Sequence, residues 1–236
     1  MDISSSVALV TGGNRGLGRH LAAQLLERGA KVYVGARDPE SVDLPGAVPI
    51  RLDITDPDAV AAAARLAADT TLLVNNAGIS TGVGLVDGDL DDIRREMATH
   101  YFGSLDMIRA FAPVLTANGG GAVLNVLSVL SWIHRPGVGG YSAAKAAEWA
   151  MTNVVRTELA PAGITVTALH VGYMDTDMAA RVPAGQKIDP AVVAVRALDA
   201  VQAGTPEVLA DELSHTVRAG LSGGLEVLYP ELTARV

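Results

Sequence analysis

The feature that most constrains the fold of this chain is a regular alternation of short apolar runs with longer segments of helical periodicity. The short runs are rich in β-branched residues, as buried strands are, and they span residues 7–10, 31–35, 48–52, 71–74, 122–126 and 164–168. Apolar residues recur at helical spacing over residues 21–26, 93–115 and 143–159. Repeated strand–helix–strand units require crossover connections. We therefore predict an α/β fold, a doubly wound Rossmann-type domain with a parallel sheet of about seven strands covered by helices on both faces.

Local signals place the element boundaries. Gly29 lies where a glycine would end the first helix, and Asp56-Pro57 is typical of a helix start. A further strand is expected over 206–210, followed by a helix over 211–221. No repeat, low-complexity tract or linker interrupts the pattern. The 236 residues are enough to bury a full core, so we expect a single domain over residues 1–236.

Composition excludes several classes of function. The net charge of −8 disfavours binding to nucleic acid or to an anionic membrane surface. The chain has no cysteine, which excludes disulfides, thiolate metal ligands and cysteine nucleophiles, and no metal site is predicted. The N-terminus has no basic region before its first apolar run, and the alanine-rich run 59–68 is too short to span a bilayer. We expect a cytoplasmic protein.

A glycine-rich segment joins the first predicted strand to the first helix, with the sequence Val10-Thr-Gly-Gly-Asn-Arg-Gly-Leu-Gly18. Glycines here permit a tight turn and let the backbone approach a pyrophosphate at the helix N-terminus. A plain strand-to-helix turn is the alternative interpretation of this segment taken alone. Its G-x-x-x-G-x-G spacing differs from the G-x-G-x-x-G of most dinucleotide folds.

The end of the second predicted strand indicates which dinucleotide is bound. A carboxylate there would bind the adenosine ribose hydroxyls and repel a 2′-phosphate. This chain has Ala36 and then Arg37 at that point, and Arg15 in the glycine segment can reach the same corner. Arginine offers bidentate hydrogen bonds to phosphate, which favours NADP(H). The alternative is that both arginines are solvated surface residues, and Asp38 would weaken the preference if it turned inward.

Tyr141 and Lys145 are four residues apart in a predicted helix, so their side chains share one helix face. An ammonium roughly 4 Å from a phenol, at an effective dielectric near 20, favours the phenolate by about 4 kcal/mol. This predicts a tyrosine pKa lowered from about 10 to near 7, suited to proton transfer. Ser128 lies at the end of the fifth predicted strand, where its hydroxyl can hold a substrate oxygen.

In their order and spacing, the glycine segment, Asn75-Asn-Ala-Gly78, Ser128 and the Tyr141/Lys145 pair resemble the short-chain dehydrogenase/reductase family over about residues 5–210. The resemblance implies a Ser128, Tyr141 and Lys145 catalytic set, and a homo-oligomer that is a dimer or a tetramer. It also implies these NADP(H) contacts: Gly12, Asn14, Arg15, Gly16, Leu17, Gly18, Arg37, Asp53, Asn75, Ala77, Gly78, Tyr141, Lys145, Gly172 and Thr176. For Asp53, a helix-capping or turn role remains an equal alternative.

The sequence departs from the family pattern in three places. His100-Tyr-Phe-Gly103 stands where the family has Asn-x-x-Gly, so His100 either bridges water toward Lys145 or is an interior histidine. His170-Val-Gly172 stands where the family has Pro-Gly. The segment after residue 210 differs from the C-terminal strand that packs in family tetramers, so that contact cannot be assumed.

Residues after Ser128 and after the sixth predicted strand are expected to wall the substrate site: Leu130, Trp132, Ile133, His134, Tyr173, Met174 and 177–187. Their apolar character favours a small, largely apolar carbonyl compound or secondary alcohol. The predicted function is that of an NADP(H)-dependent oxidoreductase transferring hydride between the nicotinamide and such a substrate. The alternative is a non-catalytic NADP(H)-sensing protein on the same fold. Sugar-nucleotide epimerase chemistry is disfavoured because it usually needs a larger C-terminal substrate domain.

Overall fold

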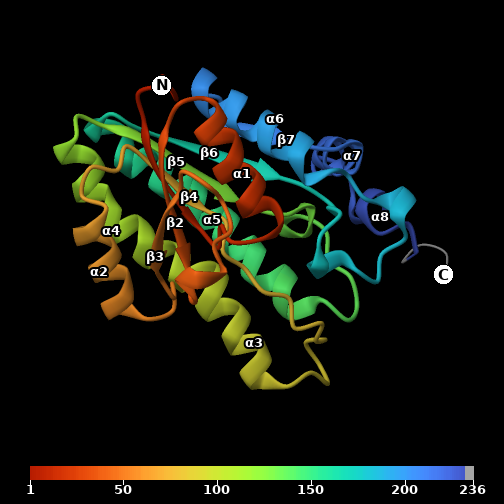
Figure 1. The fold of residues 1–236 in the computed structure, drawn as a ribbon. Coiled ribbons are helices and arrows are strands. Elements are labelled where there is room, and N and C mark those ends of the chain that lie inside the picture. The colour runs from red at the N-terminus through yellow and green to blue at the C-terminus, as the bar shows by residue number, and fades with distance from the viewer. Residues whose placement is uncertain (232–236) are drawn as a thin grey trace.

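A seven-stranded parallel sheet forms the centre of the computed structural model, which describes residues 1–231 (Figure 1). The strand order is β3-β2-β1-β4-β5-β6-β7, with the chain reversing direction across the sheet between β3 and β4. The predicted α/β doubly wound class is confirmed. The strands are β1 (Val7–Thr11), β2 (Lys31–Ala36), β3 (Val48–Arg51), β4 (Leu72–Asn75), β5 (Gly121–Val126), β6 (Ile164–His170) and β7 (Glu207–Leu209).

Burial along the strands follows their position in the sheet. All four residues of the central strand β4 are buried, as expected for a parallel strand covered on both faces. The edge strand β3 buries only Ile50 and carries Pro49. A proline is tolerated there because an edge strand has one side without a hydrogen-bonding neighbour.

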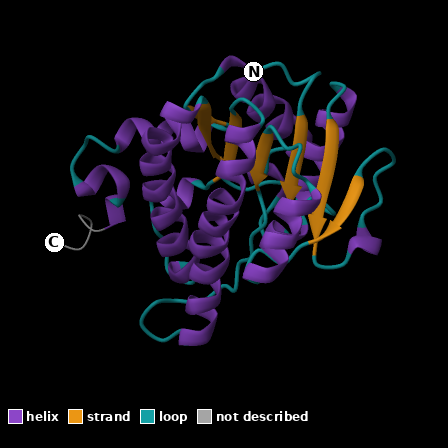
Figure 2. Cartoon of the chain, turned by 90° about the vertical axis from the view of Figure 1, so that its left-hand side faces the viewer, coloured by secondary structure: helices purple, strands orange, loops and turns teal. Residues whose placement is uncertain are grey.

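Helices cover both faces of the sheet (Figures 1 and 2). On one face, Leu21 and Leu25 of α1 (Gly16–Glu27) share an apolar core with Val193 and Leu198 of α6 (Pro190–Ala203). The other face is covered by α2 (Pro57–Leu66), α4 (Ser104–Ala117) and α5 (Gly139–Leu159). Phe111 of α4, which is fully buried, lies at the centre of that second core.

Helix ends follow the signals in the sequence. Asp56 and Asp189 cap α2 and α6 by accepting hydrogen bonds from the amides of Asp58 and Ala191, and a proline follows each at the first helical position. Gly29 has a φ of 91°, a left-handed conformation that glycine adopts without strain. The predicted boundaries at these points are confirmed.

The predicted helical segment 93–115 is interrupted. It comprises α3 (Leu90–Met97), a π-helical turn η2 (Ala98–Gly103) and α4. Gly103 permits the close approach of this segment to the loop after β3, since a Cβ at this position would lie 2.9 Å from the Ile54 side chain. Turns of this kind often occur at functional sites, and this one carries His100.

The last described elements are α7 (Glu212–Gly220) and α8 (Leu225–Leu228). β7 and α7 agree with the strand predicted over 206–210 and the helix predicted over 211–221, whereas α8 was not predicted. Val217 of α7 packs into a small apolar cluster with residues that follow β5. Short 3₁₀ turns lie at Pro39–Ser41, Val129–Ser131, Ala160–Ala162, Asp177–Ala179 and Ala184–Gln186. Within residues 1–231, every helix is too short or too polar to cross a membrane.

Candidate active site

The predicted site residues gather at one edge of the sheet because all seven strands are parallel. The glycine segment follows β1, Asn75-Asn-Ala-Gly78 spans the end of β4, Ser128 follows β5 and Gly172 follows β6. From β1 the chain continues to β2 and β3 on one side of the sheet, and β4 then lies on the other side of β1. In open α/β sheets, ligands bind at the carboxyl ends of the two strands where the order switches in this way, here β1 and β4.

The glycine segment forms a tight turn that opens into α1. Gly12 and Gly16 have φ angles of 62° and 53°, a region that favours glycine. A Cβ at Gly18 would lie 2.4 Å from the Gly12 carbonyl oxygen, so this helix–turn contact requires glycine. No side chain caps the N-terminus of α1 and its first turn has no acidic residue. Its leading amides are therefore suited to an anion such as a pyrophosphate.

The asparagines after β4 fasten this turn to the centre of the sheet. The Asn76 side-chain amide donates to the carbonyl oxygens of Thr11 (2.9 Å) and Gly12 (3.2 Å). The Asn75 amide donates to Asn125 Oδ1 on β5 at 2.9 Å. Ala77 packs on Gly12, where a Cβ would lie 3.0 Å from the Ala77 Cα. Small residues at these points keep the turn close to the strand ends.

The corner predicted to hold the second phosphate is exposed and carries two arginines, Arg15 and Arg37. The Arg15 guanidinium lies 3.5 Å from the Asp177 carboxylate, with both side chains largely exposed. Arg37 is also exposed, directly after β2. The Asp38 carboxylate accepts a hydrogen bond from the Glu40 amide, so it is engaged in its own turn. Asn14 donates to Ser41 Oγ at 3.0 Å.

Asp53 takes the turn role that the sequence left open. Its Oδ1 accepts hydrogen bonds from the Thr55 amide (2.9 Å) and hydroxyl (2.7 Å). Burial opposes ionisation, but these bonds and the nearby Arg37 charge outweigh it and lower the Asp53 pKa. The group is an anion close to Arg37.

Ser128, Tyr141 and Lys145 meet at the start of α5. Ser128 caps the turn Val129–Ser131, with its Oγ accepting from the Leu130 amide at 3.1 Å. Lys145 Nζ lies 5.9 Å from the centre of the Tyr141 ring, one helical turn away. The Ser128 hydroxyl lies close enough to Tyr141 to lower the pKa of the phenol. The structure thus brings together the three residues predicted from spacing.

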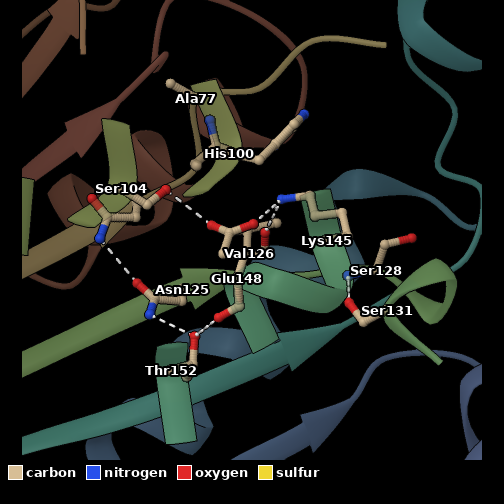
Figure 3. Close-up of polar contacts among 12 residues, drawn as sticks. Ala77, His100, Ser104, Asn125, Val126, Ser128, Ser131, Lys145, Glu148 and Thr152 are labelled. Carbon is tan, nitrogen blue, oxygen red and sulfur yellow. Dashed lines mark hydrogen bonds and ion pairs between the residues drawn. The ribbon is translucent and has the colours of Figure 1, made fainter. Parts of the chain in front are cut away.

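Lys145 is held by a buried carboxylate that the sequence analysis did not select. Its Nζ donates to Glu148 Oε2 at 2.6 Å and to the Val126 carbonyl at 2.8 Å, and Glu148 Oε1 accepts from Ser104 Oγ at 2.9 Å (Figure 3). Lys145 and Glu148 are only 5% and 1% exposed. Their i, i+3 spacing places both on one helix face and was the available sequence signal.

The predicted lowering of the Tyr141 pKa is wrong for the protein without cofactor. Burial of the phenol raises its pKa, and the carboxylates of Glu148 and Glu96 act in the same direction. The ammonium of Lys145 and the Ser128 hydroxyl lower it by less. The four-residue spacing of Tyr141 and Lys145 indicated the lysine alone, whereas the fold also places two acids near the phenol. Tyr141 is therefore a protonated phenol at neutral pH.

His100 is an interior histidine in contact with Tyr141. Its Nε2 lies 2.8 Å from the Ile79 carbonyl oxygen, and the two rings meet edge to face with centres 5.0 Å apart. Burial, followed by the Lys145 charge, lowers the His100 pKa well below its usual value, so the ring is neutral. Its Nδ1 is buried without a partner in the described structure. The interior-histidine alternative fits these contacts.

Glu96, on the preceding turn, secures the same loop. Its Oε1 accepts from the Thr81 amide at 2.6 Å and from the Thr81 hydroxyl at 2.8 Å. Glu96 and His100 therefore hold residues 79–81 against α3 and η2. Sequence reasoning missed Glu96 because a glutamate in a polar helix is usually solvated.

The segment after β6 meets the Ser128 loop through His170. The imidazole stacks on Trp132 with ring centres 3.7 Å apart, and Nδ1 lies 3.3 Å from the Ser128 carbonyl oxygen. The Gly172 amide donates to the Asp211 carboxylate. Thr176 approaches the glycine turn, where a Cβ at Gly16 would lie 3.5 Å from its methyl group. Thr176 thus lies beside the glycine turn, whereas the Gly172 amide is engaged by Asp211.

Leu130, Trp132 and Ile133, predicted to wall the substrate site, lie in an apolar cluster against which Tyr141 packs. All three are buried in the apolar cluster that α7 covers through Val217. A separate shallow hollow of about 260 Å³ lies beside the start of α5, lined by Gly84, Leu85, His134, Arg135, Pro136, Gly137 and Gly139. His134 is exposed at its rim, with Nδ1 2.8 Å from the Tyr229 hydroxyl.

Fold and site together define a dinucleotide-binding α/β protein with a serine, tyrosine and lysine set. The chain belongs to the short chain dehydrogenase family, whose model matches residues 6–187.

Relatives with named activities are similar over most of the chain. It is 32% identical to gluconate 5-dehydrogenase of Gluconobacter oxydans, covering 78% of this chain and 77% of that protein. It is 31% identical to an NADPH-dependent 1-acyldihydroxyacetone phosphate reductase of Schizosaccharomyces pombe, over 78% of this chain but only 64% of that protein's length. A solved short chain dehydrogenase of Burkholderia cenocepacia in complex with NADP has a TM-score of 0.93 and 41% identity, covering 98% of this chain and 99% of that one.

Proposed function

We propose that this protein is an NADP(H)-dependent oxidoreductase that transfers hydride between the nicotinamide and a carbonyl compound or secondary alcohol. The observation that carries the proposal is the meeting of Ser128, Tyr141 and Lys145 beside the glycine turn at the carboxyl edge of the sheet. The NADP complex of the Burkholderia cenocepacia relative and the NADPH dependence named for the yeast reductase support the choice of cofactor.

The residues of this edge fit a dinucleotide. The uncapped N-terminus of α1, with Gly12, Gly16, Leu17 and Gly18, would receive the pyrophosphate. The other proposed contacts are Arg15 and Arg37 for the 2′-phosphate, Asp53 for the adenine, Asn14, Asn75, Ala77 and Gly78 along the cofactor, Lys145 for the nicotinamide ribose, and Gly172 and Thr176 for the carboxamide. When bound, the nicotinamide supplies or accepts the hydride, and its oxidised form adds positive charge near Tyr141.

Proton transfer and stabilisation of the substrate oxygen are proposed to depend on three side chains. In carbonyl reduction, the Tyr141 phenol donates its proton to the substrate oxygen as negative charge develops there. The Ser128 hydroxyl donates a hydrogen bond to the same oxygen. The raised pKa of Tyr141, caused by burial, keeps this proton in place until the substrate is reduced. The reverse oxidation needs the phenolate, which the Lys145 charge favours.

The substrate proposed is small and largely apolar. The hollow beside α5 offers Leu85, Pro136 and three glycines, with Arg135 as its charged residue. A compound with an apolar body and one carbonyl fits this lining. We also propose that the chain is a single cytoplasmic domain that acts as a homo-oligomer.

Tyr141→Phe tests the proposed activity. Turnover of NADPH with a panel of ketones and aldehydes should fall by at least about a hundredfold, because general acid catalysis contributes 10²–10⁴. NADPH binding, followed by fluorescence titration, should be unchanged. An unchanged rate would remove Tyr141 from the mechanism. Tight NADPH binding by the unaltered protein without turnover on any carbonyl would support a dinucleotide sensor instead.

A further inference from the structure

Glu148 is a buried acid at the centre of the catalytic helix. Its carboxylate contacts two donors, the Lys145 ammonium at 2.6 Å and the Ser104 hydroxyl at 2.9 Å (Figure 3). It is 1% exposed. A buried carboxylate is costly unless its oxygens are paired, and here both oxygens have a partner. Burial raises the pKa of Glu148, and the contacts with Lys145 and Ser104 oppose that rise by favouring the ionised form.

The pair leaves Lys145 with one free direction. An ammonium has three N–H donors, and two of them are directed to Glu148 and to the Val126 carbonyl. The third is available on the side of Tyr141, whose ring centre lies 5.9 Å from Nζ. Glu148 thus fixes the orientation of the group that is proposed to act on the tyrosine and the ribose.

The same carboxylate also cancels much of the lysine's charge at the phenol. A lone ammonium favours the phenolate, but an ammonium with a carboxylate 2.6 Å away acts on its surroundings as a dipole. The other ionisable groups around this point are Glu96 on α3 and His100 on η2. Glu96 opposes phenolate formation as Glu148 does, and His100 is neutral. The remaining polar contacts, Ser104 and Thr152, carry no charge.

We propose that Glu148 is a positioning residue for the oxidoreductase reaction: it orients Lys145 and, by compensating its charge, sets the pH at which Tyr141 exchanges its proton. The inference rests on the proposed roles of Tyr141 and Lys145. Glu148 controls the proton chemistry of this site through its charge. Ser128 and His100 are neutral and exert no such control.

Glu148→Gln is the direct test. The amide oxygen can still accept from Lys145, and its NH₂ can donate to Ser104 Oγ, so the buried contacts survive without the negative charge. With that charge removed, the phenolate is favoured. The midpoint of the pH–rate profile for alcohol oxidation with NADP⁺ should then move to lower pH by about one unit. An unmoved midpoint, or one moved to higher pH, would overturn the proposal.

Two matched variants separate charge from structure. Glu148→Asp keeps the charge and should keep the midpoint near that of the unaltered protein, even if its rate falls. Thr152→Val removes a neutral buried hydrogen bond to the Glu148 carbonyl and should lower the melting temperature without moving the midpoint. A midpoint that moved equally in Thr152→Val would mean that disturbance of the helix, and not charge, is responsible.

The proposed function and the proposed role of Glu148 can be overturned independently. If Tyr141→Phe retained full turnover, the catalytic assignment itself would be wrong. If Tyr141→Phe lost turnover while Glu148→Gln kept the original profile, the assignment would stand and the role of Glu148 would fall. Circular dichroism and thermal melting of each variant establish that the folded protein is being compared.

Discussion

Two ion pairs at the carboxyl edge of the sheet differ in how far they are exposed to solvent. Arg15 and Asp177, on the side of the glycine turn, have side chains that are 69% and 85% exposed and 3.5 Å apart. The side chains of Lys145 and Glu148, both on α5, are 6% and 2% exposed, with the two charged groups 2.6 Å apart. The first pair is solvated and contributes little to stability, so Arg15 is free to exchange its partner for a phosphate. The second is enclosed, so its geometry is imposed by the fold.

The difference reflects the separate requirements of cofactor binding and of proton transfer. A cofactor that enters and leaves is best bound by exposed cations, which lose little free energy when they exchange a carboxylate partner for a phosphate. A proton donor that must be correctly placed in every cycle needs neighbours that cannot rearrange. Removing a residue should therefore disturb folding on the buried side and ligand selectivity on the exposed side.

The largest effect is expected from Lys145→Ala. It leaves the Glu148 carboxylate buried without its cation, which should lower the free energy of unfolding by about 3–5 kcal/mol at pH 7. Burial raises the pKa of Glu148 and Lys145 opposes this, so losing Lys145 makes protonation of the carboxyl easier. The deficit, measured by urea denaturation, should therefore shrink between pH 7 and pH 5. It should also be smaller in the double variant Lys145→Ala/Glu148→Gln. A deficit unaffected by pH and by the second substitution would contradict the idea of an enclosed pair.

A second effect of the buried side concerns His170. Burial lowers its pKa from 6.5 to about 3. The folded state thus keeps the ring neutral while the unfolded chain protonates it. Above pH 6.5 the neutral ring costs the folded state nothing. As the pH falls from 6.5 toward 3, the unfolded chain is protonated and the folded protein is not, so the free energy of unfolding decreases. The loss is about 3 kcal/mol by pH 4. His170→Gln should flatten this acid dependence of the unfolding free energy. Parallel curves for the two proteins between pH 7 and pH 4 would show that His170 does not titrate on unfolding.

The smallest change in stability, but a change in selectivity, is expected from Arg37→Ala on the exposed side. A hydrogen bond to a charged group contributes about 1.5–3 kcal/mol, so NADPH should bind about 10–100-fold more weakly while NADH binding changes little. Fluorescence titration with both cofactors measures this, and Arg65→Ala, an exposed arginine on α2, serves as the control. Equal weakening of both cofactors would mean that Arg37 does not bind the 2′-phosphate.

Much of the architecture followed from short-range patterns. Runs of β-branched residues and helical periodicity, with Asp56-Pro57 and Gly29 as boundaries, were sufficient for the strands, the helices and the parallel sheet. Because parallel strands end at one edge, the meeting of the glycine turn with Ser128 and Tyr141 was also predictable. The π-helical turn at 98–103 was not, because its periodicity over six residues differs little from that of an α-helix.

What the amino-acid sequence by itself determined is the order of elements and the set of groups brought to the edge, since both depend on patterns a few residues long. Only the tertiary structure decided the electrostatics around Tyr141, where acids from α3 and α5 and the burial of the ring outweigh Lys145. It likewise decided that Trp132 packs against Val217 of α7. Both outcomes depend on distances between segments remote in the chain, and Coulomb energy and burial follow distance in space, not separation in sequence.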